Sequence, residues 1–342
     1  MRASLVFVGV VTIWVLWASS VAADYAADNE TFGCEANPTG NPIGGGEGYN
    51  PIFTTGDYTV TSLDELLAAL NAAQPGEIVF VPDGVEIELT GHQDVSIPQQ
   101  VTLAGTRGLN GSAGARLFTT WRKSHTMFRS GGYGVRVTGL RIEGPYGERE
   151  TVSDHSGGIS IRHSNCQVDN CEVSCFSYYG VGGAEGILGL RVHHNYIHHC
   201  QRSGYGYGVA ASGNFFYVIA NRFDSCRHHI ASSGQPGSGY EAAWNFCGPN
   251  ANSHNFDMHG GKDRGDGTKI AGDYIHIHHN TFQSSVRSIN IRGIPSQGAE
   301  IHHNWLGPAK GNVTSGGNTK AWQNLYGPEK TLDSDPIDLI WK

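Results

Sequence analysis

The feature that most constrains the fold is an internal repeat that begins near residue 135. Short apolar segments recur, and each has a marked residue three positions after its first apolar residue and another apolar residue two positions later. The marked residues follow one another at intervals of 24 to 35 and are Leu140, Cys171, Asn195, Asn221, Asn245, Asn280 and Asn304. A period of this size in short β segments predicts a solenoid in which each repeat is one coil of a parallel β-helix.

The recurring asparagines and the histidines before them have a structural explanation. Strands of neighbouring coils lie about 4.8 Å apart, so equivalent positions form a column. An asparagine column passes side-chain hydrogen bonds from coil to coil inside the turn. Three histidine pairs precede column asparagines and are predicted as turn and surface residues: His193-His194, His278-His279 and His302-His303. The alternative is a zinc site, because two histidines on one strand face and a third from the next coil can reach one ion.

The rest of the chain divides around the repeat. Residues 1–23 have a basic start, an apolar run and a small-residue end, which is the pattern of a secretory signal peptide. An uncleaved anchor is the alternative, although the run is shorter than the ~20 residues that span a bilayer. Residues 24–58 predict an irregular N-terminal arm, residues 59–306 the parallel β-helix and residues 307–342 a C-terminal capping tail. We expect an exported protein, secreted or at the cell surface.

A short helix is expected at the start of the β-helix. Ser62 and Glu65 are spaced as a capping box, and leucines follow at helical spacing. Such a helix can cover the open end of a stack of strands. The predicted fold class is therefore all-β, a right-handed parallel β-helix with a short N-terminal capping helix.

Composition supports this class and narrows the partners. The chain has 342 residues, of which 48 are glycine and 16% are charged, as an all-β repeat with many turns requires. A net charge of -8 argues against nucleic acid as the main partner. Of the seven cysteines, Cys200 and Cys226 each follow their column asparagine by five residues. We expect these two to stack on adjacent coils, close enough for a disulfide.

A second family of strands brings an acid and a base together. Its inward positions are Ile159, Val181, Val209, Ile230, Phe256 and Ile289. The outward positions hold small residues in three successive coils, which predicts a shallow trough. Beside the trough the outward residues are Asp257, His259, Asn290 and Arg292, with His229 one strand position earlier on the preceding coil and Arg162 on the first coil of the family. An inserted segment at Gly260 to Gly272 directly follows His259, and such loops commonly build a binding face.

The coil pattern resembles the right-handed parallel β-helix superfamily that includes pectate lyases and related polysaccharide-active proteins. The resemblance runs from the opening helix through Leu306. Within it, Phe256-Asp257-Met258-His259 is similar to a motif of the alginate (mannuronan) epimerases, an aromatic or aliphatic residue followed by Asp, Pro and His, with Met258 in place of the proline. By that resemblance Asp257 and His259 are catalytic, and His254 stands where the family has a tyrosine.

The residues of this face suit an acidic polysaccharide. In a lyase, an arginine neutralises the uronate carboxylate and acidifies the neighbouring C–H, and a base then removes that proton. The predicted catalytic residues are His259 or His254 as the base, Asp257 to orient an imidazole, and Arg292 to neutralise the carboxylate. The predicted substrate-binding residues are His229, Asn290, Arg287, Tyr240 and Arg162, with Tyr240 also available as an acid.

We therefore expect a lyase or epimerase that acts on a uronate-containing polysaccharide. One alternative is a noncatalytic carbohydrate-binding or cell-surface solenoid, for which the trough is only a binding face. Another is a glycoside hydrolase, which needs two facing carboxylates, whereas this face offers Asp257 plainly. The motif requires no metal. Calcium at Asp263, Asp266 and Asp273 is the cofactor alternative.

Alone, the stretch Ser253 to Gly261 also fits a half-buried strand with a solvated polar face.

Overall fold

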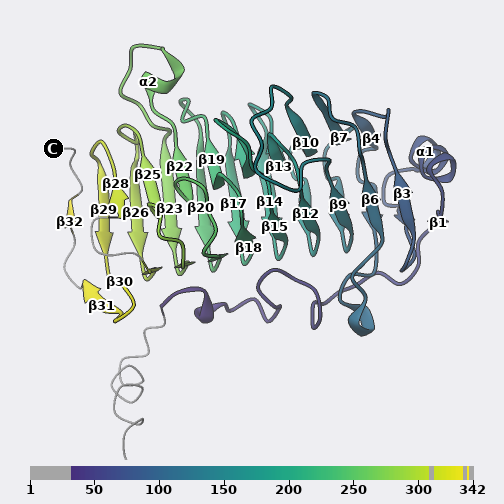
Figure 1. The fold of residues 1–342 in the computed structure, drawn as a ribbon, viewed down its shortest axis with the longest axis horizontal. Helices are drawn as coiled ribbons and strands as arrows, with labels where there is room; N and C mark the ends of the chain where they lie inside the picture. The colour runs from purple at the N-terminus through teal and green to yellow at the C-terminus, as the bar shows by residue number, and fades with distance from the viewer. Residues whose placement is uncertain (1–31, 308–311, 334–336, 339–342) are drawn as a thin grey trace, which may run out of the picture. The chain divides into compact units, whose positions relative to one another are not determined.

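The computed structural model describes residues 32–307, 312–333 and 337–338 (Figure 1). The predicted signal peptide at residues 1–23, the first part of the arm and the end of the tail lie outside these ranges. Among the described residues, the strands form three sheets of 12, 11 and 9 strands, here called sheets A, B and C. Each coil contributes one short strand to each sheet in turn, the arrangement of a parallel β-helix.

The strand bounds follow the sheets. Sheet A contains β1 (Tyr58–Thr59), β2 (Ile78–Phe80), β5 (Thr102–Ala104), β8 (Arg136–Thr138), β11 (Gln167–Asp169), β14 (Leu188–His193), β17 (Phe215–Ile219), β20 (Gly239–Ala243), β23 (Tyr274–His278), β26 (Gly298–His302), β29 (Thr319–Trp322) and β32 (Ile337–Asp338). Sheet B contains β3 (Glu86–Glu88), β6 (Arg116–Phe118), β9 (Arg141–Glu143), β12 (Glu172–Ser174), β15 (Tyr196–His198), β18 (Arg222–Asp224), β21 (Phe246–Cys247), β24 (Thr281–Phe282), β27 (Trp305–Leu306), β30 (Asn324–Tyr326) and β31 (Thr331–Asp333). Sheet C contains β4 (Val95–Ile97), β7 (His125–Ser130), β10 (Ser156–Ile161), β13 (Tyr179–Gly183), β16 (Tyr207–Ala211), β19 (His228–Ser232), β22 (Phe256–Met258), β25 (Ile289–Ile291) and β28 (Val313–Thr314).

The predicted register is the observed one. In sheet A, Val168 pairs with Val192 and Val192 with Val218 on successive coils. In sheet C, Ile230 pairs with Phe256, and Phe256 pairs with Ile289. These inward side chains are fully buried and belong to one apolar cluster between the three sheets. The alternating pattern of the sequence fixes this register, because a slip by one residue would turn the apolar set outward.

Parallel pairing continues beyond residue 306, where the sequence predicts only a capping tail. Strands β28, β29 and β30 pair in parallel with β25, β26 and β27 and complete one more coil. Antiparallel pairing appears only afterwards, between β30 and β31 and between β29 and β32. The described part of the tail is therefore partly a further coil of the solenoid.

The asparagine column forms a buried hydrogen-bond ladder. The Nδ2 group of Asn245 donates to Oδ1 of Asn280 at 2.9 Å and to the carbonyl oxygen of Val218 at 2.8 Å, and the same contacts recur along the column. Asn324 extends the ladder by one coil, with its Oδ1 3.0 Å from Nδ2 of Asn304. The ladder satisfies backbone groups that the tight turn between sheets A and B would otherwise leave unpaired.

The residue before each ladder asparagine adopts a left-handed conformation. Its φ is 54° at His194, 54° at His279 and 55° at His303. A short turn between two strands of one coil requires this conformation. These histidines are turn residues, as the sequence predicts.

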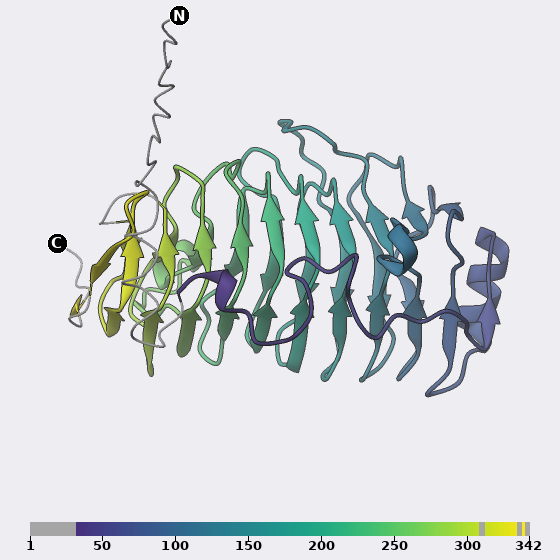
Figure 2. The same cartoon turned by 90° about the horizontal axis from the view of Figure 1, so that it is seen from below.

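The N-terminal segment lies along the solenoid, and Figure 2 shows it crossing successive strands. After a short 3₁₀ helix, Cys34–Ala36, its backbone bonds one coil after another: the amide of Gly44 donates to the carbonyl of Ala220, and that of Gly46 to Oδ1 of Asn170. A second 3₁₀ helix spans Leu109–Gly111. Residues 32–57 thus form the irregular arm that the composition predicts.

Helix α1 (Leu63–Ala72) follows the arm, and Ser62 is its N-cap, with Oγ accepting from the amide of Glu65 at 3.3 Å. Its buried side chains Leu66, Ala69 and Leu70 join the core cluster. A second short helix, α2 (Gly261–Arg264), lies in the inserted segment after β22. Among the described residues, no helix has the length and apolar character needed to cross a membrane.

The expected disulfide is absent. All seven cysteines are free thiols, and Cys200 and Cys226 are both fully buried. The two stack on adjacent coils as expected, and burial together with the Cys200 thiol raises the pKa of Cys226. They act as small apolar residues of the core rather than as a cross-link.

Candidate functional site

Sheet C places the acid and the base of the predicted motif on one face. On β22, Asp257 pairs with Ala231 of β19 on one side and with Asn290 of β25 on the other. Because side chains alternate along a strand, Phe256 and Met258 enter the core while Asp257 points away from it. The carboxylate is nevertheless fully buried, because side chains of the neighbouring coils close over it.

Five side chains surround the Asp257 carboxylate. Arg292 donates from Nε to Oδ1 at 2.9 Å and from Nη2 to Oδ2 at 2.6 Å. His259 has Nε2 3.0 Å from Oδ2, and His254 has Nδ1 3.7 Å from Oδ1. His228 has Nε2 3.6 Å from Oδ2, and Asn290 donates to Oδ1 at 3.2 Å.

These partners decide the protonation of Asp257. Burial by itself would raise the pKa of the carboxyl. The hydrogen bonds of His254 and His259 and the charge of Arg292 outweigh burial and hold the pKa well below its usual range. Asp257 is therefore a carboxylate at every physiological pH, and it can orient an imidazole rather than act as an acid.

Asn290 assigns the roles of the two ring nitrogens of His254. Arg287 and Thr314 both donate to Asn290 Oδ1, at 3.3 Å and 2.6 Å, so the amide nitrogen faces the opposite way. That nitrogen lies 3.2 Å from His254 Nδ1 and donates to it. His254 Nδ1 is therefore an acceptor, and the ring proton of the neutral imidazole is on Nε2.

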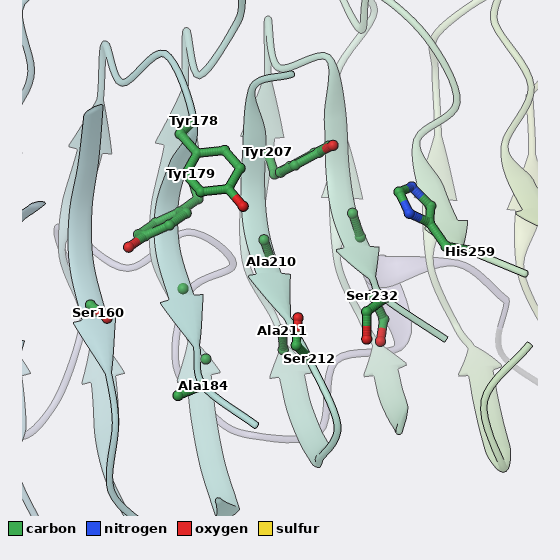
Figure 3. A pocket seen from close by; sticks show the side chains of 14 residues that line it. Ser160, Tyr178, Tyr179, Ala184, Tyr207, Ala210, Ala211, Ser212, Ser232 and His259 are labelled. Atoms are coloured by element: carbon green, nitrogen blue, oxygen red, sulfur yellow. The ribbon is translucent and has the colours of Figure 1, made fainter. Parts of the chain in front are cut away.

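His259 connects this cluster to a groove on sheet C (Figure 3). The groove has a volume of about 280 Å³ and contains His259 at one end. Its floor is the predicted trough of small residues, which includes Gly182, Ala210 and Ala231. Ser232 and Ser233 also line it, and among the described residues neither hydroxyl has a hydrogen-bond partner. Small side chains on three coils leave room for a ligand directly beside the imidazole.

Tyrosines that sequence reasoning missed form one wall of the groove. Tyr178, Tyr179 and Tyr207 line it, and Figure 3 shows their rings projecting above the small residues of the strands. The rings of Tyr178 and Tyr207 lie 6.1 Å apart, and Tyr207 stacks on His228 at 5.7 Å. Tyr179 pairs with Tyr207 and Tyr207 with His228, so one column two residues before the inward position was the available signal.

The expected role of His229 is wrong, and its neighbour His228 takes its place. His229 is fully buried and stacks on Phe223 in the core at 5.3 Å. The amides of His229 and Ile230 both bond the carbonyl of Asn255, at 2.8 Å and 3.1 Å, so the alternation of side chains breaks at this point. His228 therefore points toward Asp257, and its Nδ1 donates to the His254 carbonyl at 2.6 Å. Burial lowers the pKa of His228 to about 3, so the ring is neutral.

Tyr240 and Arg162 also lie elsewhere than expected. Tyr240 is fully buried beside Phe216, and burial strongly raises the pKa of its hydroxyl, so it neither reaches substrate nor donates a proton there. It stands two residues before the inward Ala242, and alternation turns it into the core. Arg162 is outward as predicted, but it pairs with Asp94 at 2.6 Å on the coils remote from Asp257.

The structure corrects the role expected of Arg292. Two of its nitrogens bind Asp257, and Nη1 binds Asp263 of α2 at 3.1 Å. A guanidinium held by two carboxylates is not free to neutralise a substrate carboxylate. Arg292 instead fixes the position of Asp257 and ties the inserted loop, through Asp263, to the strand face.

The aspartates considered for calcium are separated by their partners. Asp263 binds Arg292, Asp266 binds Arg264 and Thr268, and Asp273 binds Ser296. His228, His254 and Asp257 have ligand atoms within 4.8 Å of one another, but Arg292 already places a positive charge on that carboxylate. Among the described residues, the other cluster of this kind is Glu241, His276 and His278 on sheet A.

Comparison with known proteins bears on the fold. No protein-family model matches the sequence, and no curated protein sequence matches it. Among solved structures, the chain is similar to the crystal structure of an alginate lyase from Paenibacillus sp. str. FPU-7. The TM-score is 0.56 at 16% sequence identity, and the match covers 81% of this chain and 97% of the other. At this identity the similarity establishes a shared fold, a solenoid of parallel sheets.

Proposed function

We propose that this protein is a polysaccharide lyase that cleaves a uronate-containing polysaccharide by β-elimination, with His259 as the base. The observation that carries the proposal is the buried Asp257 carboxylate behind a histidine at the end of an open groove. A carboxylate that stays ionised can fix the tautomer and direction of an imidazole, which is how such pairs activate a base.

The tautomer of His259 follows from its contact with Asp257. A carboxylate 3.0 Å from Nε2 favours the form with the proton on Nε2, which leaves the lone pair on Nδ1. That nitrogen takes the proton from C5 of the uronate, next to its carboxylate. The electron pair of the C–H bond forms the C4=C5 double bond, the C4–O bond breaks, and the leaving oxygen takes a proton from solvent or a groove hydroxyl.

The groove supplies substrate contacts. The free hydroxyls of Ser232 and Ser233 beside His259 can donate to the uronate carboxylate and stabilise the charge that develops there. The tyrosine wall offers faces on which sugar rings stack, and the trough gives the chain room to lie across several coils. The similar alginate lyase makes an acidic polysaccharide such as alginate the first substrate to test.

An epimerase begins with the same proton abstraction, and it differs only in returning a proton to the opposite face of C5 instead of releasing the C4 oxygen. A glycoside hydrolase is disfavoured, because it needs two facing carboxylates. None of the described residues that line the groove is aspartate or glutamate. A noncatalytic binder would use the same groove without His259 chemistry.

The finer features of the fold and the location belong to this proposal. A right-handed coil is the expected hand of parallel crossover connections, and α1 is placed to shield the first coil. Residues 1–23 act as a signal peptide, so the lyase works outside the cytoplasm on extracellular polysaccharide.

The proposal is tested by incubating the purified protein with alginate, pectate and other uronate polysaccharides and following ultraviolet absorbance. An unsaturated uronate product should appear with the wild-type protein and be absent with His259→Ala. The matched control is His163→Ala, a histidine just beyond β10 whose Nδ1 lies 3.1 Å from Ser130 and which lies outside the groove lining. No absorbance change on any substrate, together with unchanged sugar composition, would favour the noncatalytic binder.

A further inference from the structure

A second polar cluster lies on sheet A, away from the groove of sheet C. Outward side chains of adjacent strands converge there: Glu241 of β20 pairs with His276 of β23, and His278 of β23 pairs with His302 of β26. His276 is also two residues before His278, so both rings stand on the same side of one strand. Three imidazoles and one carboxylate therefore meet at one place on the surface.

The distances suit a single ion. His276 Nε2 lies 2.9 Å from His302 Nε2, and His278 Nε2 lies 3.3 Å from Glu241 Oε1. One ligand atom from each of Glu241, His276 and His278 lies within 4.8 Å of the others. Two ligands of a tetrahedral zinc ion lie about 3.3 Å apart, since each bond is about 2.0–2.1 Å. Small ring rotations would bring the four groups to that spacing.

The rings are held in place by their neighbours. His302 stacks on His278 at 5.3 Å and on Trp322 at 4.6 Å. Nδ1 of His278 lies 2.8 Å from Nδ1 of His279, and Nδ1 of His302 lies 2.8 Å from Nδ1 of His303. When the nearer ring donates from Nδ1, its Nε2 carries the lone pair that a metal needs, and the following turn histidine fixes that tautomer.

The cluster is also neutral enough to accept a cation. Burial, followed by the neighbouring imidazoles, lowers the pKa of His302 to about 3 and also lowers that of His276. Glu241 supplies the negative charge, and its hydrogen bond with His278 lowers its pKa. Unlike the cluster around Asp257, this one has no arginine bound to its carboxylate in the described structure.

We propose that Glu241, His276 and His278, with His302 as the fourth ligand, bind a zinc-class divalent transition-metal ion on sheet A. The ion replaces the proton that His276 and His302 otherwise share between their Nε2 atoms, so binding releases protons. It joins β20, β23 and β26 across three successive coils. Its place on a different sheet from the groove makes it a structural clamp of the solenoid.

The test uses the protein without a polyhistidine tag, stripped of metal and titrated with zinc by calorimetry. Cobalt(II) serves as a second probe, because tetrahedral coordination gives it a visible absorption spectrum. We expect one ion per chain and a higher melting temperature with zinc, and His276→Ala and His278→Ala should each weaken zinc binding at least tenfold. Melting temperatures without metal show whether each variant is folded. Glu241→Gln, which keeps the shape of the side chain, replaces any variant that is not.

His198→Ala is the matched control. His198 also lies on an outward strand, has Nε2 3.1 Å from a glutamate (Glu172) and is followed by a turn histidine, but it lacks the further imidazoles of the cluster. It should bind zinc as the wild type does. The proposal is overturned if the wild type binds no stoichiometric zinc, if His276→Ala and His278→Ala bind it unchanged, or if His228→Ala at the Asp257 cluster alone abolishes binding.

Discussion

Replacing Asp257 by asparagine should destabilise the protein substantially, because it removes the negative charge from a fully buried cluster. Arg292 makes two charge-assisted bonds to this carboxylate, at 2.9 Å and 2.6 Å. Removing one partner of a buried ion pair costs about 3–5 kcal/mol. Arg292 keeps its bond to Asp263 and is partly exposed, so we expect the lower end, about 3 kcal/mol. At about 2 °C per kcal/mol, the melting temperature should fall by about 6 °C.

The control for this substitution is Asp263→Asn. It touches the same arginine on its solvent side, where an ion pair contributes about 1 kcal/mol or less. Urea unfolding of both variants beside the wild type measures the difference in free energy. An Asp257→Asn protein within about 1 kcal/mol of the wild type would refute the reasoning, since Asp257 would then not be the charge that holds the cluster together.

Three further predictions follow from single contacts. Asn245→Ala should cost about 3 kcal/mol in urea unfolding, because it leaves buried ladder groups unpaired, whereas the exposed Asn250→Ala should cost little. His229 has a pKa lowered by burial from 6.5 to about 3, so the unfolded chain binds more protons between these values and stability is lost as pH falls below 6.5. His229→Leu should flatten this dependence by up to about 1.4 kcal/mol per pH unit, and an unchanged slope would contradict the core position of the ring. Tyr207→Ala should raise KM for the polysaccharide more than it lowers kcat, and equal losses in kcat and kcat/KM would place the ring in the transition state instead.

The coil register and the Asp257–His259 pair could be predicted because both follow from strict alternation. Ile230, Phe256 and Ile289 pair as the apolar pattern requires, and the outward Asp257 is then adjacent to Asn290. The asparagine ladder was predictable for a similar reason, since one polar residue repeats at one place in the coil.

The errors at the site come from effects that alternation does not encode. The shared bonds of the Asn255 carbonyl exchange the directions of His228 and His229. Arg292 was predicted to face substrate, but its charge is taken by Asp257 and by Asp263 from the inserted loop. Tyr240 is different, because the register itself turned it inward and only its chemistry suggested an acid.

The most direct test of the central claim is hydrogen exchange at C5 of the uronate. The polysaccharide is incubated with the protein in deuterated water, and recovered sugars and products are examined by NMR for deuterium at C5 and for the C4=C5 double bond. The account predicts loss of the C5 proton with the wild-type protein, whether the product is unsaturated or epimerised, and no loss with His259→Ala. Turnover that leaves the C5 proton in place, or C5 chemistry that persists in His259→Ala, would contradict it.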